Sequence, residues 1–107
     1  MAVYSTLLAA GRLTGAGDAL VYTAPAVGTV VVRDIELDAT AIDVGVVSVY
    51  VLSGSVASTI YSVPVVTARQ SQHWDGRAVL LPGDAVYVYR DGGPVSYRVS
   101  GYLLGGA

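Results

Sequence analysis

The sequence predicts an all-β fold: a single antiparallel β-sandwich of about eight strands, with a jelly-roll-like topology and an extended N-terminal segment. Valine, a β-branched residue that favours strands, occurs 20 times among the 107 residues. Apolar segments are interrupted about every 8–12 residues by Gly, Pro, Asp or Ser, a spacing typical of sandwiches and barrels. No segment shows a sustained apolar period of about 3.6 residues, so helix is not expected.

The chain begins with a segment that we expect to form an N-terminal arm over residues 1–17, followed by the sandwich domain over residues 18–107. Glycines make the segment too flexible for a strand interior, at Gly11, Gly15 and Gly17. Three apolar side chains in it need burial: Leu7, Leu8 and Leu13. They could pack on their own domain, or the arm could reach across a neighbouring subunit.

The strands of the sandwich are expected where apolar and β-branched residues concentrate. Their ranges are Ala19–Ala24, Thr29–Asp38, Val44–Ser53, Ser58–Val63, Gln70–Trp74, Arg77–Leu81, Ala85–Arg90 and Val95–Leu104. Turn residues separate them, at Pro25-Ala26-Val27-Gly28, Pro82-Gly83-Asp84 and Asp91-Gly92-Gly93-Pro94. Asp75-Gly76 predicts a tight hairpin.

Two of these strands lack the polar face that an antiparallel sandwich presents to water. Val44–Ser53 places valines on one face and Tyr50 and Leu52 on the other, and Ala85–Arg90 opposes its valines with Tyr87 and Tyr89. Charged residues make up only 13% of the chain, about half of the ~25% typical of soluble domains. We therefore predict a subunit interface and a homo-oligomer, trimeric or larger. Its candidate residues are Tyr50, Leu52, Trp74, Tyr87 and Tyr89, together with Leu7, Leu8 and Leu13.

Composition excludes several function classes. There are no cysteines, which removes disulfides, thiolate metal sites and cysteine nucleophiles. The net charge is −2 and the six arginines are scattered, so no nucleic-acid partner is expected. No apolar run approaches the ~18 residues that span a bilayer, so no membrane partner is expected.

The sequence gives little sign of chemistry. His73 is the single histidine, and no pair of carboxylates lies near it in the sequence, so we expect no metal site there. A role of His73 as a general base, assisted by Asp75 and a serine, is the weaker alternative. Every second residue of one strand is acidic, at Asp34, Glu36 and Asp38, so these side chains share one face. Their spacing is compatible with the carboxylates of a glycosidase or with Ca²⁺ binding. A solvated outer face whose charge discourages edge-to-edge pairing explains them better. We expect no catalytic residue, metal or cofactor.

Three segments carry a resemblance to a known family. They are Val21-Tyr22-Thr23-Ala24-Pro25-Ala26 with Val30–Leu37, the run from His73 to Val86, and the ending from Val95 to Leu104. Together they resemble small virion proteins of tailed bacteriophages that infect GC-rich actinobacteria, often described as minor tail proteins. The resemblance covers roughly residues 19–104 and rests on strand and turn signatures.

The resemblance implies a non-enzymatic structural subunit located in the virion and assembled in the host cytoplasm, with other virion structural proteins as partners. A minor tail protein of the tip or fibre region is the first expectation, and a capsid decoration protein is the second. A carbohydrate-binding module that recognises host glycans is an alternative of another class. It would stack sugar rings on Trp74, Tyr87 and Tyr89.

Overall fold

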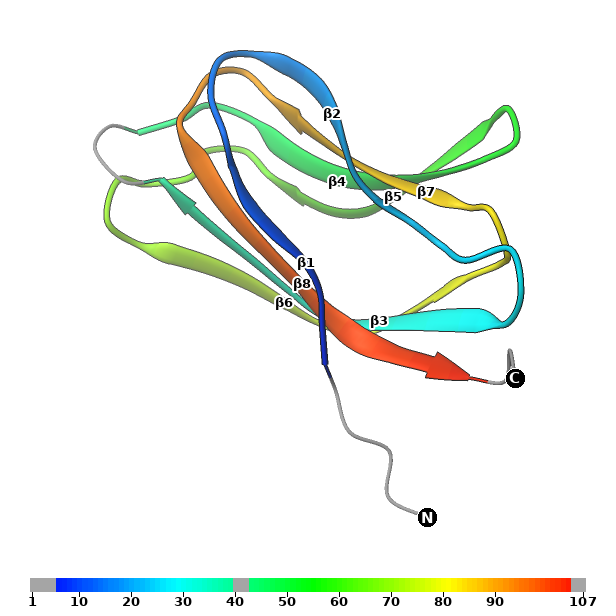
Figure 1. Cartoon of the computed structure of the whole chain (residues 1–107). Helices are drawn as coiled ribbons and strands as arrows, with labels where there is room; N and C mark the ends of the chain where they lie inside the picture. Colours follow the sequence, from blue (N-terminus) through cyan, green and yellow to red (C-terminus); the bar gives the residue numbers. More distant parts are fainter. Residues whose placement is uncertain (1–5, 40–42, 105–107) are drawn as a thin grey trace.

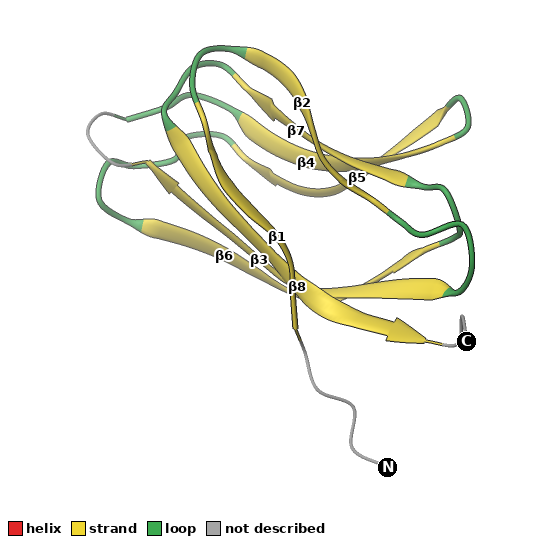
Figure 2. Ribbon diagram, in the orientation of Figure 1, coloured by secondary structure: helices red, strands yellow, loops and turns green. Residues whose placement is uncertain are grey.

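A computed structural model describes residues 6–39 and 43–104, which form eight β-strands in two layers (Figure 1). The strands are β1 (Thr6–Leu13), β2 (Gly17–Thr23), β3 (Thr29–Ala39), β4 (Val47–Ser53), β5 (Val56–Val63), β6 (Ser71–Leu80), β7 (Ala85–Arg90) and β8 (Val95–Leu104). Figure 2 shows only strands and loops in these ranges. Among the described residues, no helix has the length and apolarity to cross a membrane. The predicted all-β fold is confirmed.

The two sheets have the order of a jelly roll. Sheet A runs β1-β8-β3-β6, sheet B runs β2-β7-β4-β5, and every neighbouring pair is antiparallel. The first strand pairs with the last, the second with the seventh, the third with the sixth, and the fourth with the fifth. A long hairpin folded over into two sheets gives this pairing, so the predicted jelly-roll-like topology is also confirmed.

The core lies between the sheets and follows the alternation of each strand. Ile35 and Leu37 of β3 are fully buried, and the valines on one face of β4 and of β7 are buried as well. The opposite residues of these strands lie on the outer faces. The buried hydrophobic residues are dominated by valine, whose branched side chain packs well on a pleated surface.

The N-terminal segment differs from the prediction. Thr6–Leu13 form β1, which pairs with β8 at an edge of sheet A, so this part of the expected arm belongs to the sandwich. Gly11 fits a strand here because a Cβ at this position would lie 2.8 Å from the phenol oxygen of Tyr97. Glycine thus leaves room for a neighbouring ring. Residues 1–5 of the predicted arm lie outside the described residues.

The predicted hairpin at Asp75-Gly76 is wrong. β6 runs through both residues, and the register with β3 shifts there, from Val32 opposite Ala78 to Asp34 opposite Asp75. Two residues of β6 thus stand against one of β3, which defines a β-bulge. A Cβ at Gly76 would lie 2.8 Å from the indole ring of Trp74, so glycine is needed for packing and not for a turn.

Register shifts occur in all four strands that lie at sheet edges. These are β1 and β6 in sheet A and β2 and β5 in sheet B. Besides the bulge in β6, each of the other three has one residue without a partner in the neighbouring strand, at Leu8, Val21 and Ile60. Such bulges interrupt the ladder and increase the local twist of an edge strand.

Arg90 anchors the β1–β2 connection to the end of β7. Its side chain is 5% exposed, and its guanidinium donates hydrogen bonds to the carbonyl oxygens of Gly17 at 2.9 Å and Thr14 at 3.3 Å. A third hydrogen bond, at 3.4 Å, goes to the carbonyl oxygen of Val88. Since a buried charge is costly without hydrogen-bond partners, these carbonyl groups make its position in the sandwich tolerable.

Candidate functional site

The outer face of sheet B brings together four of the eight predicted interface residues. Tyr87 of β7 lies between Leu20 of β2 and Tyr50 of β4, and Tyr89 and Leu52 flank this row on β7 and β4. We call these five residues the tyrosine face. Leu20 is 55% exposed although it is apolar. Sequence reasoning did not single out Leu20, although the strand Ala19–Ala24 is largely apolar on both of its faces.

The tyrosines of this face are held in place. The rings of Tyr50 and Tyr87 stack with their centroids 5.5 Å apart and their planes 9° from parallel. The hydroxyl of Tyr50 donates to Asp18 Oδ1 at 2.9 Å, and the hydroxyl of Tyr89 donates to Asp91 Oδ1 at 2.8 Å. Aromatic side chains fixed in this way lose little conformational entropy when another surface covers them.

These contacts also shift the acidity of two phenols. Partial burial, followed by the hydrogen bond and charge of Asp18, raises the pKa of Tyr50 above its usual value of 10.0. The hydrogen bond to Asp91 and the charge of that carboxylate raise the pKa of Tyr89. In both cases the neighbouring anion favours the protonated, neutral phenol. The phenols therefore act as hydrogen-bond donors on this face at neutral pH.

The other four predicted interface residues lie in sheet A. Trp74 of β6 is opposite the buried Ile35 and packs partly against the core. Leu8 and Leu13 of β1 also pack against the core, whereas Leu7 is 49% exposed. Trp74 therefore belongs to a different sheet from Tyr87 and Tyr89, so the sugar-stacking platform of these three aromatic residues is not formed.

The outer face of sheet A has the opposite character. At least seven ionisable side chains from three neighbouring strands occupy it, and we call the following the charged face: Asp34, Glu36, Asp38, His73, Asp75, Arg77 and Arg98. A hollow of about 360 Å³ lies between β1 and β6 and is lined by Asp34, Glu36, His73 and Arg98, with Thr6, Leu7 and Ser100. The predicted acidic row of β3 is confirmed as an outer row. Since β3 is a central strand, however, this row cannot protect a sheet edge.

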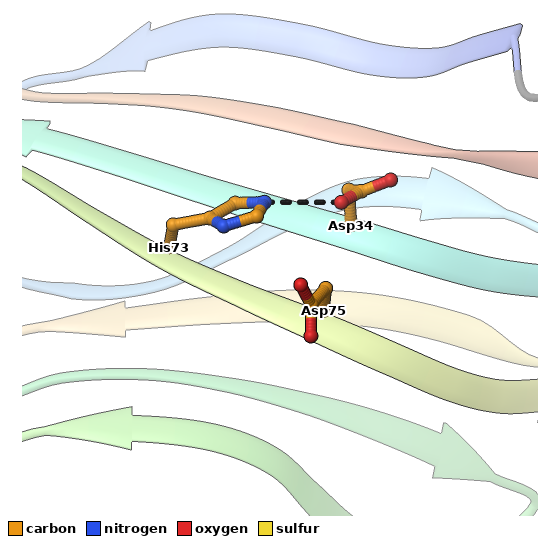
Figure 3. Close-up of side chains that lie close together, drawn as sticks. All are labelled: Asp34, His73 and Asp75. Carbon is orange, nitrogen blue, oxygen red and sulfur yellow. Dashed lines mark hydrogen bonds and ion pairs between the residues drawn. The ribbon is translucent and has the colours of Figure 1, made fainter.

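A cluster of three potential metal ligands lies within the charged face (Figure 3). Asp34 and Asp75 are direct partners across β3 and β6, and Nε2 of His73 lies 3.0 Å from Asp34 Oδ1. One potential ligand atom from each residue lies within 4.8 Å of those of the other two. The sequence-based statement that His73 has no pair of carboxylates nearby is therefore wrong. The misplaced hairpin at Asp75-Gly76 concealed the pairing.

Comparison with known proteins identifies no relative. No protein-family model, no curated protein and no solved structure matches the chain.

Proposed function

We propose that this chain is a non-enzymatic structural subunit of a bacteriophage virion, a minor tail protein, and that it works by binding copies of itself through the tyrosine face. The virion role rests on the resemblance of the strand and turn segments to small phage virion proteins. The contrast between the two outer faces carries the proposal for the binding surface. One face has at least seven ionisable side chains, whereas the other exposes Leu20 beside three tyrosines.

The composition of the tyrosine face supports association. Tyrosine is enriched at protein interfaces because its ring buries a large apolar area while its hydroxyl keeps a hydrogen-bond partner. The two carboxylates beside this face, Asp18 and Asp91, already accept hydrogen bonds from Tyr50 and Tyr89. Covering these hydroxyls would therefore leave their hydrogen bonds intact, which lowers the cost of desolvation.

The contact is proposed between copies of the chain because the chain carries few charges and has one outer face that is poor in them. Charged residues make up only 13% of the chain, so few charged side chains oppose the association of two copies through the tyrosine face. A closed ring of copies would bury this face in every subunit and leave the charged face in water.

The experiment is analytical ultracentrifugation over a range of concentrations. We expect the native chain to form an oligomer that dissociates on dilution, and Leu20→Ser combined with Tyr87→Ser to shift it to monomer. The matched control is Val79→Ser, which replaces an apolar residue that is 53% exposed and lies on β6 in the other sheet. A native chain that stays monomeric at high concentration, or a double variant that assembles as the native chain does, would refute self-association through this face.

The virion role has its own test. Antibodies against the chain should bind purified particles of its phage at the tail, as seen by electron microscopy. Labelling spread evenly over the head would instead identify a capsid decoration protein, and particles that lack the chain altogether would reject the virion role. A monomeric chain with glycan affinity would favour the carbohydrate-binding alternative.

A further inference from the structure

We propose that Asp34, His73 and Asp75 form a binding site for a divalent transition-metal ion of the Zn²⁺ type on the outer face of sheet A. This inference does not depend on the proposed function. It starts from the donor set, which combines one imidazole nitrogen with two carboxylates. Zinc is bound in proteins by histidine nitrogen and by Asp or Glu oxygen, at about 2.0–2.2 Å.

The distances in the cluster suit a single ion. Two ligand atoms on a tetrahedral Zn²⁺ with bonds of about 2.0–2.1 Å lie about 3.3 Å apart. Nε2 of His73 and Oδ1 of Asp34 are 3.0 Å apart, close to this separation. All three ligand atoms lie within 4.8 Å of one another, and Asp75 is exposed, so rotation of its side chain can bring its carboxylate to the ion.

The strand pairing fixes the backbone positions of the three potential ligands. Asp34 lies in the central strand β3, and His73 and Asp75 lie two residues apart on the neighbouring strand β6, so both point to the same face. Figure 3 shows the three side chains converging above these two strands. Ligands that are attached to paired strands are held more precisely than ligands on loops.

Electrostatics give an independent reason for a cation here. Asp34 and Asp75 are directly opposite each other, an arrangement that is destabilising for like charges in an antiparallel pair. Glu36, opposite His73, adds a third carboxylate to the same surface. Arg98 lines the hollow with them from the far side of β3, and Arg77 lies two residues beyond Asp75 on the same face of β6, outside the cluster. A divalent ion between Asp34, His73 and Asp75 would remove the repulsion between the two aspartates.

The imidazole decides which class of ion fits. Ca²⁺ takes oxygen ligands, and Mg²⁺ binds through carboxylates and retained waters, so neither gains from His73. Imidazole suits Zn²⁺, Cu²⁺, Ni²⁺ and iron. Three protein ligands leave one tetrahedral position open, and His73 is half-exposed at 50%, so water or another ligand from solution can complete the coordination.

The test uses the untagged full chain, because an affinity tag of histidines would itself bind Zn²⁺. The chain is treated with chelator, dialysed and titrated with Zn²⁺ and, separately, with Ca²⁺ by isothermal calorimetry. We expect one Zn²⁺ per chain and weaker or no Ca²⁺ binding. Because His73 is the only histidine, its ring signals in the NMR spectrum are unambiguous and should shift with Zn²⁺ occupancy.

Variants separate the proposed site from general attraction to acidic side chains. His73→Ala and Asp75→Asn should each weaken Zn²⁺ binding about tenfold or more. Asp38→Asn is the matched control, because it removes one negative charge from the same face of β3. Asp38 accepts a hydrogen bond from Ser71 and is not one of the three cluster residues. We expect it to change Zn²⁺ affinity about twofold or less.

Three outcomes would overturn the proposal. They are the absence of Zn²⁺ binding to the native chain, equal binding of Ca²⁺ and Zn²⁺, and an equal loss of affinity in the Asp38→Asn control. Circular dichroism of each variant confirms that it is folded. If His73→Ala does not fold, the NMR shift of the His73 ring in the Asp75→Asn and Asp38→Asn variants decides the question.

Discussion

Replacing Gly101 with alanine tests the packing at the centre of sheet A. Gly101 is a buried residue of β8 and lies between Thr6 of β1 and Val32 of β3. A Cβ at this position would overlap the carbonyl oxygen of Val31 and lie 2.9 Å from the carbonyl carbon of Val31 and 3.0 Å from the Cα of Val32. These are backbone atoms that cannot rotate away, so β3 and β8 would have to separate locally.

The expected loss of stability has two parts. Extra volume in a well-packed interior costs about 1–3 kcal/mol, and the upper value applies where the obstacle is backbone. Separating the strands also weakens at least one ladder hydrogen bond, worth about 0.5–1.5 kcal/mol. We expect Gly101→Ala to lower the free energy of unfolding by about 3 kcal/mol or more, which for a domain of this size lowers Tm by about 12 °C or more.

The assay is urea unfolding followed by circular dichroism and by the fluorescence of Trp74, the only tryptophan. Gly92→Ala is the matched control, because a Cβ there would meet no heavy atom within 4 Å and Gly92 does not have a positive φ. We expect this control to change the free energy of unfolding by about 1 kcal/mol or less, in the stabilising direction. If both variants were as stable as the native chain, the close approach of β3 and β8 would be refuted.

Two further predictions concern polar contacts. Arg90→Ala removes the hydrogen bonds to the carbonyls of Thr14 and Gly17 and should lower the free energy of unfolding by about 2–3 kcal/mol. The exposed Arg98, replaced by alanine as a control, should change the free energy of unfolding by about 0.5 kcal/mol or less. Equal losses of the two variants in urea unfolding would contradict the anchoring role of Arg90. Asp18→Asn removes the anion that helps to raise the pKa of Tyr50, so this pKa should fall toward 10.0, as followed by phenolate absorbance. Because the folded state holds the phenol proton of Tyr50 more tightly than the unfolded state does, this proton contributes to stability fully below the unfolded pKa, and the contribution is lost as pH rises through the raised pKa. An unchanged phenol titration in the Asp18→Asn variant would argue against the contact with Asp18.

The faces of individual strands were predictable from the sequence. Alternation alone placed Ile35 and Leu37 inside and Asp34 outside, and it placed Tyr87 on an outer face. This works because side chains of a regular strand point to opposite sides at every step, so away from a bulge one buried residue assigns the faces of its neighbours. Seven of the eight strands were therefore placed, although two of the predicted ranges are parts of the single strand β6.

Glycines caused the main errors. Gly11 and Gly76 were interpreted as signs of flexibility and of a turn, but both lie inside strands beside an aromatic ring, of Tyr97 and Trp74 respectively. For Gly11 the sequence cannot show this, because folding brings the ring of Tyr97 close, whereas Trp74 is only two residues from Gly76 on the same strand. An aromatic residue two positions from a glycine on the same strand, as Trp74 is from Gly76, is the signal that would have helped.

The cluster of potential metal ligands was not predictable for a related reason. Asp34 and His73 are 39 residues apart, and their contact depends on the register between β3 and β6. That register includes a bulge, and a shift of one residue would move Asp75 to the opposite face. The tyrosine face was easier to predict because it required only that each strand keep its alternation.

The irregular edge strands limit how copies of this molecule could associate. A regular, flat edge lets the sheet of one molecule continue into that of the next, which leads to open-ended fibres. Here a bulge interrupts the ladder in each of β1, β2, β5 and β6, so hydrogen bonding along an edge cannot run unbroken into a second chain. Under the proposed self-association, contacts between copies would then be made by side chains on the broad surfaces, which can end in a defined number of subunits instead of growing without limit.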